Sequence, residues 1–87
     1  MNYCVYILLS HSKNKFFTYV GYTKDVKKRL ELHNTAKGAK FTRGRNWRLI
    51  YKKSYKYKSI AMKNEYKLKN DKFKRNYIKD AYIKKYL

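Results

Sequence analysis

The sequence of 87 residues has no proline, three glycines, one cysteine and only five acidic residues. A single cysteine excludes a disulfide framework and a zinc ribbon or finger built on cysteines, and the absence of proline excludes a proline-rich linker. The longest apolar run, residues 4–9, is too short to cross a bilayer and has no basic segment before it. We therefore expect a soluble, cytoplasmic protein in which Cys4 is a small buried hydrophobic residue.

Cations dominate what the sequence does contain. Twenty-four Lys and Arg against five Asp and Glu give a net charge of +19, and a polyanion or salt must offset the resulting self-repulsion. Nucleic acid is the favoured partner, because Lys and Arg displace condensed counterions from phosphate, and an acidic membrane surface is the alternative. Codon drift in an A- and T-rich coding sequence explains part of the lysine excess. It explains the five arginines less well, since arginine grips phosphate in a bidentate fork.

The first quarter of the chain predicts an antiparallel hairpin. Residues 3–9 and 16–22 are rich in β-branched and aromatic residues, as strands are, and the polar segment between them is typical of a turn. A tight turn centred on residues 12–13 pairs Tyr6 directly with Tyr19. Directly paired residues share a face of the sheet, so the two hydroxyl groups are expected side by side.

A helix over residues 24–35 is predicted next, with Thr23 as its N-cap. Its apolar stripe ends in His33, and Arg29 lies four residues earlier, so the two side chains are neighbours on one side of the helix. The following loop, residues 34–46, is the most basic irregular segment of the chain. Four of its cations are expected to contact backbone phosphate without reading base sequence: Lys37, Lys40, Arg43 and Arg45.

The second half predicts one strand and two helices. Residues 47–53 alternate well enough for a third strand, and Trp47 at its start is expected to pack in the core rather than stack on a base. A helix over 60–69 follows, with Ser59 as its N-cap, and a last helix covers 72–87. The pattern β-β-α-β-α-α predicts a small α+β fold, a three-stranded antiparallel sheet with helices packed on it.

The chain shows no internal repeat, linker or change in composition that would separate two parts. We therefore expect one domain over residues 1–87, with its core in residues 3–70.

Glu65 is the most informative anomaly of the second half. Its spacing from Ala61 and Leu68 places it on the apolar stripe of the 60–69 helix. A carboxylate that points inward is costly unless it is paired or binds a cation. A bound metal ion and an ion pair with one of the many lysines are the two explanations.

No cluster of His and carboxylates has chelating spacing, and no Walker loop, dinucleotide fingerprint or pairing of an activated Ser or Cys with a base is present. What remains is a set of polar groups that the predicted topology can bring together: Tyr6, Tyr19, Arg29, His33 and Glu65. Each has an ordinary alternative. The tyrosines can be half-buried sheet residues, the arginine a surface cation and the histidine a core residue of its helix.

Five segments in order match a known pattern. Residues 4–6 (Cys-Val-Tyr) and 19–21 (Tyr-Val-Gly) form two triplets, 23–34 form a helix with Arg and His, 37–43 form a basic loop, and 61–69 form a helix with one Glu. Through these segments the chain resembles the GIY-YIG endonuclease superfamily, in particular its small single-domain members from bacteria and viruses. The first triplet departs from Gly-Ile-Tyr, because cysteine replaces the glycine, and the reactive tyrosine is kept.

This resemblance implies hydrolysis of a phosphodiester with one divalent metal ion, Mg²⁺ or Mn²⁺, held by Glu65. Such ions keep several waters, so one carboxylate is enough. Arg29 would clamp the phosphoryl oxygens as charge develops.

Tyr6 and Tyr19 would orient or deprotonate the attacking water, and the positive surroundings are expected to lower the pKa of each. His33, with an ordinary pKa of about 6.5, is the more natural proton acceptor. The choice of base stays open among the three.

The function implied is a metal-dependent endonuclease that acts on branched or damaged DNA during repair or recombination. Because no second domain reads a target, DNA structure or a protein partner is expected to supply specificity. The alternative is a non-catalytic basic module that coats DNA or RNA. A membrane role comes third, since no segment except the tail resembles a basic amphipathic helix.

Overall fold

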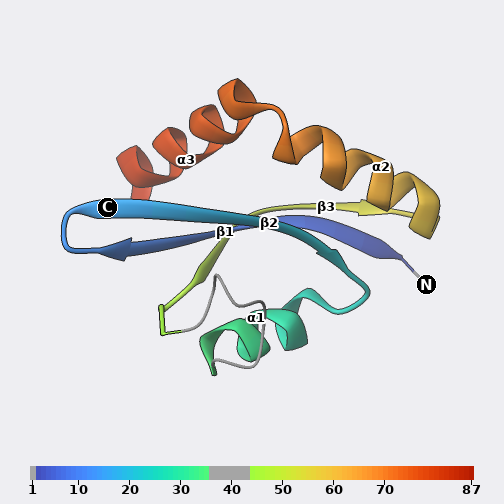
Figure 1. Ribbon diagram of the computed structural model, residues 1–87, viewed down its shortest axis with the longest axis horizontal. Helices are drawn as coiled ribbons and strands as arrows, with labels where there is room; N and C mark the ends of the chain where they lie inside the picture. The colour runs from blue at the N-terminus through green and yellow to red at the C-terminus, as the bar shows by residue number, and fades with distance from the viewer. Residues whose placement is uncertain (1, 36–43) are drawn as a thin grey trace.

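The computed structural model describes residues 2–35 and 44–87, which form a three-stranded antiparallel sheet and three helices (Figure 1). In chain order the elements are β1 (Tyr3–Ser12), β2 (Lys15–Thr23), α1 (Val26–Asn34), β3 (Arg48–Tyr55), α2 (Lys58–Lys69) and α3 (Lys72–Tyr86). The predicted α+β fold and its β-β-α-β-α-α order are confirmed. Each predicted element is present, with bounds that differ by a few residues. Among the described helices, none combines the length and apolarity needed to span a membrane.

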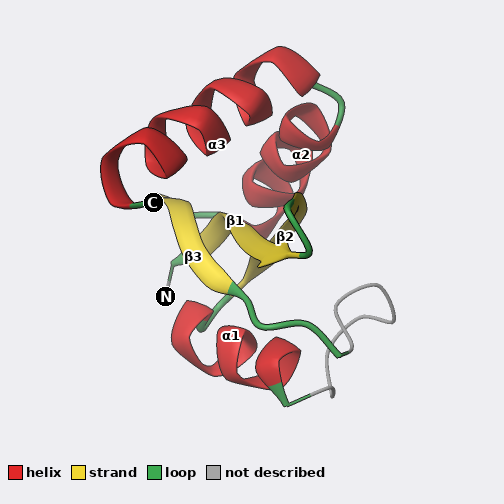
Figure 2. Ribbon diagram, turned by 90° about the vertical axis from the view of Figure 1, so that its left-hand side faces the viewer, coloured by secondary structure: helices red, strands yellow, loops and turns green. Residues whose placement is uncertain are grey.

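The sheet is the middle layer of three. Its strand order is β2-β1-β3, so β1 is central; α1 covers one face, and α2 and α3 cover the other (Figure 2). Because β1 has a neighbour on each side and helices on both faces, its residues 5–10 are all buried. The face under α2 and α3 contains Val5, Ile7, Val20, Ala61 and Leu68. The face under α1 contains Tyr6, Leu8 and Trp47, packed against Val26 and Leu30.

The hairpin turn lies one residue later than the sequence predicts. Lys13 and Asn14 both have positive φ, 50° and 64°, as two-residue turns of type I′ require. Tyr6 therefore pairs with Gly21 and not with Tyr19, and the predicted direct pairing is wrong. Moving the turn centre by one residue changes the pairing by two. Because the side chains of a strand alternate with a period of two, both tyrosines still face the same side.

Both predicted helix caps are wrong. Asp25 caps α1, where its carboxylate accepts a hydrogen bond from the backbone N–H of Lys28 at 3.1 Å. Thr23 forms a local turn, in which its hydroxyl accepts from the backbone N–H of Asp25 at 3.2 Å. At α2 the N-cap is Tyr57, without a side-chain hydrogen bond, and Ser59 lies inside the first turn. A polar residue near a helix start thus marks its location only to within about two residues.

Cys4 is not the fully buried residue expected. It is partly exposed at the beginning of β1, with its Sγ 3.3 Å from Ser54 Oγ on β3. Residues 5–10, in the middle of the strand, have the helices on both sides and are buried. The position in the strand, and not the apolar run as such, decides the burial.

Trp47 is buried against Tyr6 and Leu8, so the expected core role is confirmed. Asn34, the last residue of α1, holds it there. The backbone N–H of Trp47 donates to Asn34 Oδ1 at 2.6 Å, and Asn34 Nδ2 donates to the Trp47 carbonyl at 3.1 Å. This pair of bonds attaches the end of α1 to the start of β3 and so supports the layer that contains His33.

Candidate active site

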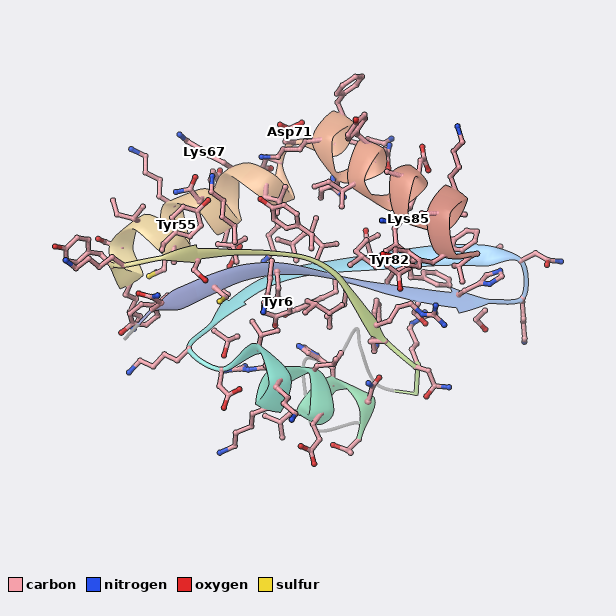
Figure 3. The ribbon with its side chains drawn as sticks, turned by 180° about the vertical axis from the view of Figure 1, so that it is seen from behind. Tyr6, Tyr55, Lys67, Asp71, Tyr82 and Lys85 are labelled. Atoms are coloured by element: carbon pink, nitrogen blue, oxygen red, sulfur yellow. The ribbon has the colours of Figure 1, made fainter. Side chains whose placement is uncertain are left out.

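The two sequence triplets face each other across the β1–β2 hairpin. Tyr6 lies opposite Gly21, and a Cβ built on that glycine would be 2.6 Å from the Tyr6 hydroxyl oxygen. The tyrosine therefore occupies the space that any side chain at position 21 would need. Its ring points from the sheet toward α1 (Figure 3), where Val26 and Leu30 pack on the same cluster.

Three rings meet on this face. The ring centroids of Tyr6 and Tyr19 are 6.4 Å apart, and that of His33 is 6.1 Å from the first and 4.9 Å from the second. The hydroxyl of Tyr6 and Nε2 of His33 share a hydrogen bond of 3.0 Å. The β hairpin supplies the tyrosines and α1 supplies the imidazole.

Burial keeps both partners of this hydrogen bond neutral. It raises the pKa of Tyr6 well above its ordinary value of 10; Tyr19 and Glu65 add to the rise, and Arg29 opposes it. Burial also lowers the pKa of His33 below 6.5, and Arg29 lowers it further. The expectation that positive surroundings lower the tyrosine pKa is therefore wrong for Tyr6, because desolvation outweighs the guanidinium.

A cleft of about 600 Å³ opens beside these rings. Tyr6, Tyr19, Arg29 and Glu65 all line it, so four of the five predicted site residues meet there. His33 is buried behind the hydroxyl of Tyr6. The remaining lining residues are Tyr3, Gly21, Tyr22, Thr23, Lys24, Asp25, Lys28, Leu32 and Lys58. With four cations and two carboxylates, the cleft is suited to an anion.

Glu65 reaches the cleft from α2. Its neighbours on the stripe, Ala61 and Leu68, are buried, and its own side chain is 16 % exposed. Oε1 forms an ion pair of 3.4 Å with Nζ of Lys69, one turn along the helix. The lysine partner considered from the sequence is therefore present, on a carboxylate that also lines the cleft.

The donor set of the cleft fits a hydrated divalent ion. Asp25, the other carboxylate of the lining, is used as the cap of α1. Within residues 2–35 and 44–87 no group of three His, Cys, Asp or Glu could chelate a metal. Mg²⁺ and Mn²⁺ suit this arrangement, since Mg²⁺ binds through one or two carboxylates and keeps several of its waters. A cleft of about 600 Å³ has room for those waters, because each takes up about 30 Å³. Glu65 is the residue that would hold such an ion.

Of the four predicted phosphate contacts, the structure describes one. Arg45 is half-buried, and its guanidinium lies over the ring of Phe17 at 3.8 Å from the centroid. Lys37, Lys40 and Arg43 lie outside the described residues, and their predicted contacts stay predictions.

Three lysines of the cleft were missed at the sequence level: Lys24, Lys28 and Lys58. A signal existed for the first two, because Lys28 directly precedes Arg29 in α1 and Lys24 lies two residues before the helix begins. Lys58 gave none. The predicted start of the second helix was two residues too late, which left this lysine in a turn.

A family model described as the GIY-YIG catalytic domain matches residues 2–78. The chain belongs to the GIY-YIG family. Membership places it in a nuclease family whose domain binds DNA, and GIY-YIG nucleases generally depend on a metal ion. The suspected resemblance is confirmed, and it extends over most of the described chain.

This GIY-YIG protein is also similar to bacterial relatives. It is 44 % identical over 66 residues to UPF0213 protein OB0043 of Oceanobacillus iheyensis. The aligned residues make up 75 % of this chain and 73 % of that relative. It is 48 % identical over 64 residues to UPF0213 protein SAG0778 of Streptococcus agalactiae, 70 % and 73 % of the two chains. A solution NMR structure of UPF0213 protein BH0048 from Bacillus halodurans is 37 % identical, with a TM-score of 0.49 over 93 % of this chain and 85 % of that one. These names specify no activity.

Proposed function

We propose that this GIY-YIG protein is an endonuclease that hydrolyses DNA phosphodiester bonds with one divalent ion, Mg²⁺ or Mn²⁺. The observation that supports it most is the meeting of two tyrosines, an arginine and a glutamate in one cationic cleft, with a neutral histidine behind the first tyrosine. The residues concerned are Tyr6, Tyr19, Arg29, Glu65 and His33.

Arg29 binds the phosphate. Its guanidinium lines the cleft with three lysines around it, and a planar fork of donors matches two phosphoryl oxygens. Negative charge on those oxygens grows as the bond to the attacking water forms, so the same contact is stronger in the transition state than with bound substrate.

The Tyr6–His33 hydrogen bond moves the proton. Neutral His33 accepts the hydroxyl proton at Nε2, which leaves the oxygen of Tyr6 free to accept from a water in the cleft. As that water attacks phosphorus, its proton passes to Tyr6 while the hydroxyl proton passes to His33, and the bond to the leaving oxygen breaks. No free tyrosinate forms, so the raised pKa of Tyr6 does not oppose the step. Tyr19 packs beside the imidazole and orients the water.

Glu65 would hold the metal ion through its carboxylate. When bound, such an ion polarises the phosphate and stabilises the charge on the leaving oxygen. The Lys69 side chain of the ion pair is 52 % exposed, whereas the Glu65 carboxylate is 16 % exposed. A divalent ion would replace the lysine as the positive partner of this carboxylate.

Target choice in this proposal depends on DNA structure. The cleft presents cations that contact phosphate, and phosphate contacts position DNA without reading bases. Branched or damaged DNA met in repair or recombination is the proposed substrate, with a protein partner as a further source of specificity.

The test is nicking of plasmid and branched DNA in Mg²⁺, Mn²⁺ or EDTA. We expect nicking that EDTA abolishes and that Glu65→Gln lowers at least about 100-fold, since a lost metal ligand removes several kcal/mol of transition-state stabilisation. Glu31→Gln is the matched control, because Glu31 is an exposed carboxylate of α1 outside the cleft. Salt-sensitive binding with no cleavage in either metal would overturn the proposal in favour of the non-catalytic binding module.

A further inference from the structure

The exposed apolar side chains are concentrated in one part of the described structure. Within residues 2–35 and 44–87, eight large apolar residues are exposed, and all of these follow residue 56, on α2, on α3 or at their ends. They are Tyr57, Ile60, Met62, Tyr66, Phe73, Tyr77, Tyr86 and Leu87. These helices cover the face of the sheet opposite α1, so their outer side is separate from the tyrosine–histidine cluster (Figures 1 and 2).

Three of these residues are aromatic and at least 69 % exposed. Phe73 is 84 % exposed and Tyr77 70 %, and they stand four positions apart, so they lie on one side of α3. Ile78 on the other side of α3 packs against the core, which directs the two rings outward. Tyr66 on α2 is 69 % exposed. We call Tyr66, Phe73 and Tyr77 the outer aromatic surface.

Cations are frequent along the same helices. Residues 57–87 contain ten Lys and Arg against three Asp and Glu. Lys63 and Lys74 are exposed and stand three residues before Tyr66 and Tyr77, within side-chain reach on a helix. A polyanion with apolar faces matches this surface. A second copy of a chain with a net charge of +19 does not, because like charges repel.

We propose that the outer aromatic surface binds single-stranded nucleic acid. Unpaired bases stack on the rings of Phe73, Tyr77 and Tyr66 while the neighbouring lysines contact phosphate, the combination used by non-specific single-strand binders. Duplex DNA offers phosphate and no free base faces, so it gains only the electrostatic part. The inference goes beyond the proposed cleavage and does not depend on it. Tyr66 follows Glu65 directly on α2, so a branched DNA with a single-stranded arm can engage both surfaces.

A tryptophan placed in the surface reports stacking directly. Phe73→Trp introduces an exposed indole into a chain whose only tryptophan, Trp47, is buried. We titrate this variant with an oligothymidylate and with a blunt hairpin duplex in EDTA, which prevents metal-dependent cleavage. We expect the single strand to quench the indole fluorescence saturably and the duplex to quench it much less. Added NaCl should remove both effects. An indole that stays unquenched while anisotropy reports bound single strand would overturn the inference.

Removing the rings measures their contribution. We expect Phe73→Ser/Tyr77→Ser to weaken single-strand binding about tenfold or more, and duplex binding less than threefold, given the usual effect of losing a base–aromatic stack. Ile60→Ser/Met62→Ser is the matched control, since it removes exposed apolar surface without removing a ring. Thermal melting shows whether each variant is folded, and Phe73→Leu/Tyr77→Leu repeats the ring removal with helix-compatible side chains.

Three results would contradict single-strand binding at this surface. Equal affinities for the ring variants and the control would place the nucleic acid elsewhere. A wild-type dimer in sedimentation that the ring variants dissociate would make the surface a contact between copies. Binding of polyglutamate with the same dependence on the rings would assign it to acidic protein. In each case plasmid nicking by the ring variants is a separate measurement, so the proposed nuclease activity stands or fails on its own.

Discussion

At the hydrogen bond between Tyr6 and His33, burial acts on two acid–base groups in opposite directions. It raises the pKa of the phenol and lowers that of the imidazole, so both are neutral near pH 7. In the proposed step this neutral pair forms no tyrosinate, and the transferred proton leaves its positive charge on His33. The sequence supplied the two residues but not this balance, because desolvation depends on what packs around them. Only the folded chain shows that Tyr6 and His33 are buried.

The lowered pKa of His33 predicts a pH dependence of stability. The unfolded chain binds a proton at this residue near pH 6.5, whereas the folded chain binds one only at lower pH. The unfolded state therefore gains protons first as the pH falls, and the free energy of unfolding decreases below about pH 6.5. Urea unfolding between pH 7.5 and 5.5 measures this loss.

Two variants give the control for that experiment. His33→Gln is expected to flatten the pH dependence, since it removes the titrating group from the core. His11→Gln removes an exposed imidazole at the end of β1 and is the matched control, expected to keep the wild-type dependence. If His33→Gln loses stability with acid as steeply as wild type, the neutral buried imidazole is the wrong description.

At the level of the elements, the sequence predicted every strand and helix found in residues 2–35 and 44–87, and its errors were local. Strand and helix periods survive in the folded chain because they reflect which face is buried. The turn and both caps were misplaced, since several polar residues near each boundary are chemically able to fill the role. The wrong hairpin pairing did not change which residues were predicted to form the site. An error of two residues keeps each side chain on its face, whereas an error of one would have put Tyr6 and Tyr19 on opposite faces of the sheet.

The attachment of α1 to β3 gives an element-scale prediction. Asn34→Ala removes two hydrogen bonds to the backbone of Trp47, and the free energy of unfolding is expected to fall by about 1–3 kcal/mol. Asn46→Ala, an exposed asparagine beside the same tryptophan, is the control, expected to change stability by less than about 0.5 kcal/mol. Chemical denaturation compares the two. Equal stabilities would show that α1 does not need this anchor.

At the scale of the whole molecule, charge and chemistry are divided between different residues. The net charge of +19 comes from cations distributed from Lys13 onward, and it attracts DNA without reading its sequence. The cleft combines that charge with groups of a different kind, two phenols, a guanidinium and a carboxylate. The sequence indicated these groups because their types and order match a nuclease family, while composition alone pointed no further than nucleic acid. Lys58 joined them only through the fold.

The most direct test separates binding from cleavage at Arg29. Its replacement by glutamine changes one of 24 cations, so DNA affinity should fall less than about threefold at moderate salt. The single-turnover cleavage constant of a branched DNA in Mg²⁺ should fall by about 100-fold or more, because the guanidinium acts on charge that develops in the transition state. Arg48→Gln, at an exposed arginine of β3 outside the cleft, should leave both quantities near wild type. Equal losses of affinity and cleavage constant for Arg29→Gln, or no loss of either, would contradict the assignment of the cleft as the catalytic centre.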